Sequence, residues 1–164
     1  RYHRAFLLAN LSHLCGGIDM TFRIPPPVLF IAFAVIMYYL PPMMTFSSSP
    51  YISLSFILVG GFIAFLSLWQ FYQFDTTIDP RHPEKTKAFV KTGIYRLSRN
   101  PMYLSLAFFL SAWAFWLQSL GAFLGVVGFI YWITYFQIRY EEAWMEKHFG
   151  QEYSRYKKRT RCWL

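Results

Sequence analysis

The chain has 164 residues and a formal net charge of +8, and 55% of its residues are hydrophobic and 22% aromatic. A single soluble domain of this length does not need so much apolar surface, so part of that surface is expected to face lipid. The basic residues flank apolar runs and form no basic–aromatic recognition module. This pattern argues against nucleic acid as a partner and favours the anionic headgroups of membrane lipids.

The N-terminal segment, residues 1–23, contains an apolar stretch at residues 5–18 behind two arginines. A secretory signal has this outline, but Leu14 stands before Cys15 where a small residue is required, and His13 interrupts the run. We expect an interfacial or partly inserted helix here, with a cleaved or tag-derived segment as the alternative. The rest of the chain, residues 24–164, is expected to form a single membrane domain.

Two long runs, residues 24–74 and 100–138, contain no Asp, Glu, Lys, Arg or His. A bilayer core about 30 Å thick needs roughly 20 apolar residues per helix, so each run has room for two spans. Lipid cannot satisfy the open edge of a sheet, so the spans are expected to be helices. Proline and serine break the first run, and a short polar turn breaks the second. We therefore predict an all-α, polytopic membrane protein with about four transmembrane helices, near residues 26–40, 51–74, 102–117 and 120–138.

Lysine and arginine are confined to three segments: three lie before residue 24, six in residues 75–99 and seven in residues 139–164. The connections within the two apolar runs have none. By the positive-inside rule, all three charged segments and both chain termini are expected in the cytoplasm. The two cysteines are then expected on the reducing side, as free thiols.

Polar and aromatic side chains are dense in "TGIYRLSRNPMY", residues 92–103, and in "FQIRYEEAWMEKHFGQEYSRY", residues 136–156. The first stretch precedes the third predicted span and the second follows the fourth, so the hairpin between them returns both to one membrane face. A shared site is therefore expected. Gly150 suits a helix C-terminus, and a further short helix with two tyrosines on one face is expected after it.

Together, "TGIYRLSRNPMY", the Glu141–Glu142 pair and "FGQEYSRY" resemble the C-terminal half of the isoprenylcysteine carboxyl methyltransferase family. The family pattern is Gly-x-Tyr, Arg-His-Pro-x-Tyr, a helical hairpin, Glu-Glu and Phe-Gly-x-x-Tyr-x-x-Tyr. Asn100 stands where the family usually has histidine. The resemblance covers residues 76–164, which we interpret as the cofactor-binding core, and "IPPP" at residues 24–27 resembles bacterial members. It implies S-adenosylmethionine as methyl donor, S-adenosylhomocysteine as product, and the inner (cytoplasmic) membrane of a bacterium.

Carried over by residue, the resemblance implies that Glu142 holds the amino group of the cofactor, with Glu141 beside it. Arg99 or Arg139 would pair with the cofactor carboxylate, and we take Arg99, Arg139 and Glu142 as the catalytic candidates. The other implied cofactor-binding residues are Lys87, Ala88, Phe89, Val90, Gly93, Tyr95, Asn100, Pro101, Met102 and Tyr103.

The residues alone leave other interpretations open. Glu141 and Glu142 also fit ordinary solvated carboxylates on a helix that enters the cytosol, and Arg96 and Arg99 also fit arginines that reach lipid headgroups. Adjacent helix positions point about 100° apart, so the two glutamates cannot face one ligand equally. Asn100 cannot titrate near neutral pH, which excludes a proton shuttle there. Histidine and cysteine show no spacing of metal ligands, so no metal is expected.

The sequence thus favours methyl transfer to a lipophilic or small acceptor at the cytoplasmic membrane face. A prenylcysteine-type carboxylate, a thiol and a lipid amine all remain possible acceptors, with carboxyl-O-methylation as the activity of the resembled family. An apolar acceptor would enter from the bilayer and the cofactor from the cytosol. The alternatives are a small four-helix transporter or channel, which would normally carry an ionisable residue at mid-membrane, and a non-enzymatic scaffold. The oligomeric state is not indicated.

Overall fold

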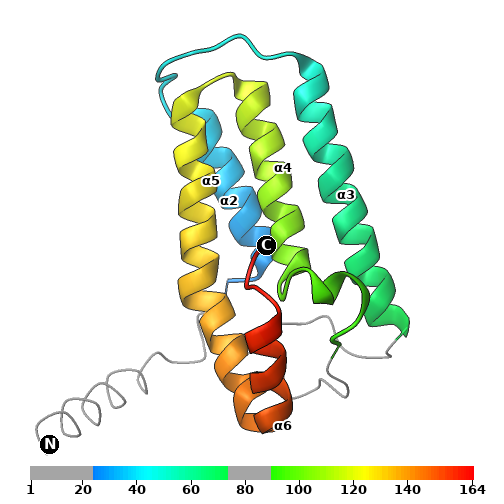
Figure 1. The fold of residues 1–164 in the computed structure, drawn as a ribbon. Coiled ribbons are helices and arrows are strands. Elements are labelled where there is room, and N and C mark those ends of the chain that lie inside the picture. Colours follow the sequence, from blue (N-terminus) through cyan, green and yellow to red (C-terminus); the bar gives the residue numbers. More distant parts are fainter. Residues whose placement is uncertain (1–23, 74–89) are drawn as a thin grey trace, which may run out of the picture.

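The computed structural model describes residues 24–73 and 90–164, and the regular elements in these ranges are helices (Figure 1). The all-α prediction is confirmed. The N-terminal segment, residues 1–23, and residues 74–89 of the polar loop lie outside the described residues. In chain order the elements are α2 (Pro26–Tyr39), α3 (Pro50–Gln73), the 3-10 helix η3 (Gly93–Arg96), α4 (Pro101–Leu117), α5 (Leu120–Trp132), the π-helix η4 (Ile133–Ile138) and α6 (Arg139–Arg159).

The helix boundaries follow from local backbone chemistry. Helices α2, α3 and α4 begin at Pro26, Pro50 and Pro101, because the fixed φ of proline suits the first helical turn and its missing N–H is not needed there. Helix α4 ends where Gln118 adopts the left-handed region, with φ 52°. The Gln118 carbonyl accepts the backbone N–H of Phe46 at 3.1 Å, which ties the two helix connections together.

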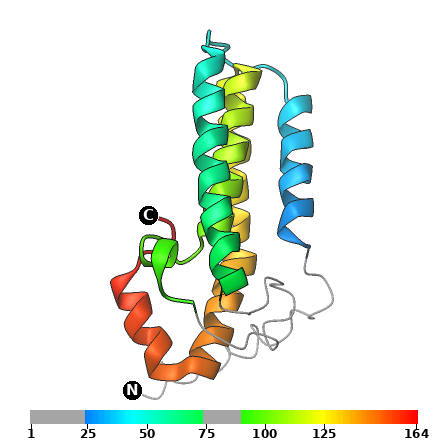
Figure 2. The same cartoon turned by 90° about the vertical axis from the view of Figure 1, so that its right-hand side faces the viewer.

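Helix α4 is the centre of the bundle, with α3 on one side and α5 on the other, and α2 packs on α5 and α4 (Figures 1 and 2). Leu110 of α4 and Phe129 of α5 are fully buried in the core. Helix α5 lies close to α2: a Cβ atom at Gly125 would be 2.3 Å from Cγ of Met37. These contacts place the third and fourth predicted spans side by side, as a hairpin.

Two helices in the described residues are long and apolar enough to cross a membrane: α3, and the continuous helix that begins at Leu120 and includes η4 and α6. Helices α2 and α4 are apolar but shorter, with 14 and 17 residues. The outer face of α3 carries large exposed apolar side chains, such as Leu58 and Phe62 at 64% and 63% exposure. The structure thus suggests a membrane protein, while the number of spans stays a prediction.

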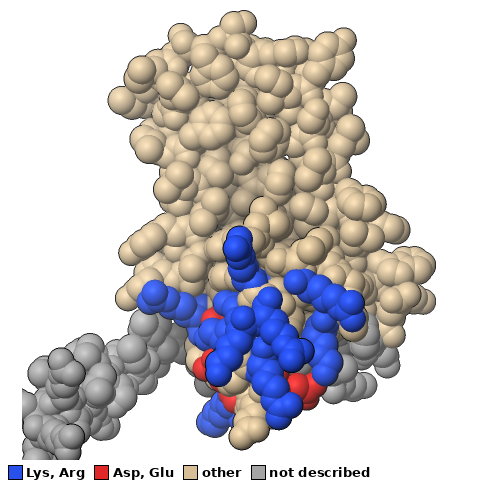
Figure 3. Space-filling view, in the orientation of Figure 1, with Lys and Arg blue, Asp and Glu red and all other residues tan. Residues whose placement is uncertain are grey.

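Lysine and arginine gather at one end of the molecule, around α6 (Figure 3). The opposite end of the bundle shows none on the same face. The sequence separates charged from apolar segments along the chain, and the fold turns this separation into a division in space. Any site for a charged ligand is therefore expected at the α6 end.

Candidate functional site

A sharp reversal at Gly150 builds the site. Its backbone, with φ 49° and ψ −122°, interrupts α6, and glycine adopts this conformation without a steric penalty. The second half of α6 then turns back toward the 3-10 helix η3 (Figure 2). There the Tyr156 hydroxyl donates to the Tyr95 carbonyl at 2.6 Å, and Tyr153 is also buried. The prediction of a helix end at Gly150, followed by a short helix with two tyrosines on one face, is confirmed, and both tyrosines are buried.

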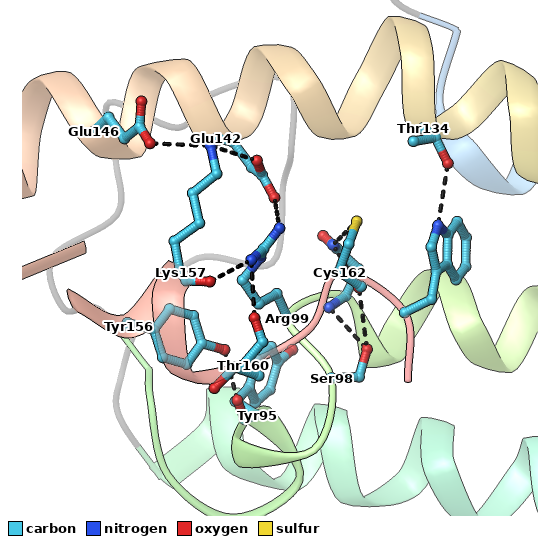
Figure 4. Close-up of polar contacts among 12 residues, drawn as sticks. Tyr95, Ser98, Arg99, Thr134, Glu142, Glu146, Tyr156, Lys157, Thr160 and Cys162 are labelled. Carbon is cyan, nitrogen blue, oxygen red and sulfur yellow. Dashed lines mark hydrogen bonds and ion pairs between the residues drawn. The ribbon is translucent and has the colours of Figure 1, made fainter. Parts of the chain in front are cut away.

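The C-terminal tail, residues 160–164, runs alongside the segment that enters α4. The backbone N–H of Arg99 donates to the Arg161 carbonyl at 3.0 Å, and the Asn100 amide Nδ2 donates to the Cys162 carbonyl at 3.1 Å. Farther on, the Trp163 indole N–H donates to Oγ1 of Thr134 at 3.2 Å (Figure 4). The tail therefore joins the start of α4 to the π-helix.

Arg99 is the centre of the polar contacts, with a side chain only 11% exposed. Its guanidinium donates to the carbonyls of Lys157 and Thr160 at 2.9 and 2.8 Å, and to Oε1 of Glu142 at 2.6 Å (Figure 4). A cation is favourable beside the last carbonyls of a helix, and α6 ends here. The third nitrogen, Nε, is buried and has no hydrogen-bond partner in the part of the chain that is described.

Glu142 completes this buried ion pair, with 13% of its side chain exposed. Its second oxygen, Oε2, accepts from Nζ of Lys157 at 2.9 Å, and Lys157 also pairs with Glu146 at 3.0 Å. The hydrogen bonds from Lys157 to these two carboxylates raise the pKa of Lys157 above its usual value, and the bond to Glu142 has the larger effect. The structure thereby rejects the interpretation of Glu142 as an ordinary solvated carboxylate, and of Arg99 as an arginine that reaches lipid headgroups.

Glu141 faces a different set of partners. Its Oε1 accepts from the Tyr103 hydroxyl and from Nε2 of Gln137, both at 2.6 Å. Gln137 is 8% exposed and lies in the π-helix η4. The two glutamates therefore point to separate sites, as expected for adjacent helix positions. Sequence reasoning did not select Gln137, although an amide near the end of a long uncharged run was a signal for it.

The remaining predicted site residues differ in their exposure to solvent. Arg139 is exposed, and its guanidinium stacks 4.7 Å from the centre of the Tyr135 ring, without an ion pair to Glu142. The structure thus brings Arg99 and Glu142 together but leaves Arg139 outside the cluster. Of the other candidates, Lys87, Ala88 and Phe89 lie outside the described residues, Val90, Tyr95, Pro101 and Tyr103 are buried, Asn100 and Met102 are partly exposed, and Gly93 is exposed.

Comparison with known proteins decides the family. A family model described as phospholipid methyltransferase matches residues 49–152, which is more than half of the chain. The chain belongs to the phospholipid methyltransferase family. This finding confirms the predicted resemblance to membrane methyltransferases, and it indicates methyltransferase activity. The matched region includes Arg99 and Glu142 but ends before the tail.

An uncharacterized protein of Haemophilus influenzae (strain ATCC 51907 / DSM 11121 / KW20 / Rd) is similar to part of this family member. It is 52% identical over 63 residues, which are 38% of this chain and the whole of that protein. No solved structure matches the chain.

Gly93 sets how η3 meets α3. Its φ of +56° lies in the left-handed region, and a Cβ atom there would come within 1.6 Å of Nε2 of Gln70. The neighbouring Tyr95 is buried, and burial raises the pKa of its phenol well above the ordinary range. Burial likewise raises the pKa of the Tyr153 and Tyr156 phenols. These phenols stay protonated at neutral pH and act as packed hydrogen-bonding groups of the site.

Proposed function

We propose that this family member transfers a methyl group from S-adenosylmethionine to a lipophilic acceptor at the charged end of its bundle. The observation that carries the proposal is the buried Arg99–Glu142 pair. It lies where the segment entering α4, the first half of α6 and the tail converge. Membership of a methyltransferase family supports the reaction class, and the site supplies groups that match the donor.

The residues present fit the charged end of this donor, which carries an ammonium and a carboxylate. Oε2 of Glu142 now binds Lys157, whose side chain is 37% exposed, so an incoming ammonium would have a displaceable partner to replace. The buried Nε–H of Arg99, which has no partner among the described residues, is a donor for a carboxylate oxygen. When bound, S-adenosylmethionine supplies a methyl group that its sulfonium already activates.

The protein's contribution is then orientation and exclusion of water. Arg99 orders the carboxylate of Glu142 and fixes the end of α6 through two carbonyls. Asn100 donates to the tail and acts through hydrogen bonding, since its amide does not titrate. Glu142 would hold the donor's amino group, and Arg99 would hold its carboxylate.

We further propose a four-span arrangement in a bacterial inner membrane, with the α6 end in the cytoplasm. The apolar exposed face of α3 and the charge at one end support this orientation. The family description supports a phospholipid amine as the acceptor. A prenylcysteine-type carboxylate and a small thiol are the competing acceptors, and the identity of the methylated product separates them.

Binding of S-adenosylhomocysteine to the purified protein, measured by calorimetry in detergent, tests the donor assignment. We expect the wild type to bind and Glu142→Gln to bind at least about tenfold more weakly, because removing a charged hydrogen bond costs about 1.5–3 kcal/mol. Glu152→Gln is the matched control, since it makes the same charge change at a side chain that is 55% exposed. Absence of binding by the wild type would overturn the proposal.

The acceptor is tested by mass spectrometry of products after incubation with the donor and phosphatidylethanolamine, prenylcysteine or a small thiol. Methylated phosphatidylethanolamine is the expected product. If only water-soluble acceptors were methylated, a lipophilic acceptor would be ruled out. If the protein bound the donor but methylated none of them, a scaffold role would be favoured.

A further inference from the structure

An apolar groove lies between the start of α2 and the junction of α5 with η4. The space that it outlines is about 450 Å³, a figure that includes space open to the surroundings. Its floor is buried, and its rim is exposed. The floor includes Leu29, Ile133 and Gln137, with exposures of 7%, 0% and 8%, and the rim includes Ile24, Trp132 and Phe136, with exposures of 42%, 41% and 48%.

The π-helix determines what the groove contains. A π-turn inserts an extra residue into a helix, and such turns occur frequently at functional sites. Here η4 covers residues 133–138 and supplies Ile133, Phe136 and Gln137 to the groove. The other lining side chains named above are apolar or aromatic, so the groove has an apolar wall and one amide on its floor.

The amide of Gln137 connects the groove to the first turn of α4. It donates to Oε1 of Glu141, which also accepts from the Tyr103 hydroxyl. Tyr103 lies in that first turn, two residues after Pro101. Earlier in the same entry segment, Arg99 binds Glu142. The groove and the buried ion pair are therefore both connected to one short segment, the groove through Gln137 and Glu141 and the ion pair through Arg99.

The chemistry of the groove identifies its occupant. The lining residues named here carry no charged side chain, which suits a hydrocarbon chain. The exposed Trp132 is of a residue type that is enriched at membrane interfaces. An amide oxygen beside a carboxylate suits an amine headgroup. The family to which the chain belongs is described as phospholipid methyltransferase, which favours a phospholipid over a prenyl chain.

We propose that this groove binds an acyl chain of the phospholipid acceptor, and that Gln137 positions the headgroup. The inference rests on the proposed function and deepens it by locating the acceptor. It assigns Gln137 as a positioning residue, because its amide lies on the groove floor and bonds Glu141. The lipid would enter sideways past Trp132 and Phe136, while the donor would occupy the Glu142 side.

Photo-crosslinking tests the location. The full chain in phosphatidylcholine nanodiscs is incubated with phosphatidylethanolamine that carries a diazirine in its acyl chain, and the adducts are mapped by mass spectrometry. We expect adducts in α2 and η4 that excess unlabelled phosphatidylethanolamine removes. Leu29→Trp, which fills the floor, should abolish these adducts, while Leu58→Trp on the exposed face of α3 should leave them unchanged.

Kinetics test the role of Gln137. In Gln137→Leu and Leu29→Trp the KM for phosphatidylethanolamine should rise about tenfold or more, the scale expected when a substrate loses pocket contacts. The Kd for S-adenosylhomocysteine should stay at its wild-type value. If Leu29→Trp fails to fold, Gln137→Leu alone decides the outcome. An unchanged KM in the folded variants would overturn the proposal.

Three labelling results would also overturn it. The first is adducts spread evenly over lipid-facing helices, and the second is removal of the adducts by prenylcysteine but not by phosphatidylethanolamine. The third is labelling of the groove that appears only after deletion of residues 1–23, which would make that segment the occupant of the groove. Because labelling needs no donor, a failure to bind S-adenosylhomocysteine would overturn the proposed function and leave the groove result standing.

Discussion

Replacement of Arg99 by methionine should be among the most destabilising single changes at this site. The variant keeps an unbranched, flexible stem but removes the guanidinium, and with it the ion pair with Glu142 and two hydrogen bonds to the end of α6. Both side chains are close to 90% buried, with exposures of 11% and 13%, so solvent screens the pair little. Removing one partner of a buried pair costs about 3–5 kcal/mol, and here Glu142 would lose its buried cation and keep only the more exposed Lys157.

At roughly 2–4 °C per kcal/mol for a chain of this size, Tm should fall by about 6–20 °C. The assay is thermal unfolding of both proteins in the same detergent. Arg155→Met is the matched control, because Arg155 is exposed and its contact to Gln151 is long, at 3.5 Å. That variant should change stability by no more than about 0.5 kcal/mol.

A double variant separates a buried charge effect from simple loss of packing. Arg99→Met combined with Glu142→Leu removes both charges, so it should recover much of the stability lost in Arg99→Met alone. The reasoning would be refuted if Arg99→Met behaved like Arg155→Met, or if the double variant lost the sum of the two single effects.

Gly93→Ala should lower Tm, because a Cβ there meets α3 at positive φ, whereas Gly61→Ala, with open space at its Cβ, should not. Tyr156→Phe should cost about 1–3 kcal/mol in chemical unfolding, since a buried backbone carbonyl loses its donor. Glu142 raises the pKa of Lys157, so protonated Lys157 stabilises the folded state. This stabilisation is complete below the usual lysine pKa of 10.5 and is lost as the pH rises through the raised pKa. Lys157→Met should therefore weaken the alkaline fall in Tm; an identical fall in both proteins would contradict this.

The helices could be predicted because their signals are local. The length of each uncharged run indicated two helices, and Pro26, Pro50 and Pro101 mark where three of these four helices begin. Gly150 likewise marks the break in α6, because its backbone conformation excludes most other residues. Signals of this kind depend on a few neighbouring residues and need no knowledge of tertiary contacts.

The site could be predicted only in part, since its partners are distant in the chain. The motif segments pointed to Arg99 and Glu142 separately, but their pairing depends on how far the second half of α6 turns back. Arg139 was grouped with Arg99 on charge alone, whereas the Tyr135 ring one turn earlier offers it a cation–π contact. Gln137 was missed because hydrophobic periodicity does not reveal a π-turn.

The reversal at Gly150 has a consequence for comparing proteins across large sequence distances. The two arms of α6 meet only if the number of residues between Glu142 and Gly150 is kept, because one inserted residue would rotate everything beyond it by about 100°. Lys157 would then leave the side of the helix that faces Glu142. Insertions should thus be far less tolerated in this interval than substitutions, and a search for distant homologues should weight the spacing between glutamate and glycine above the identity of the residues between them.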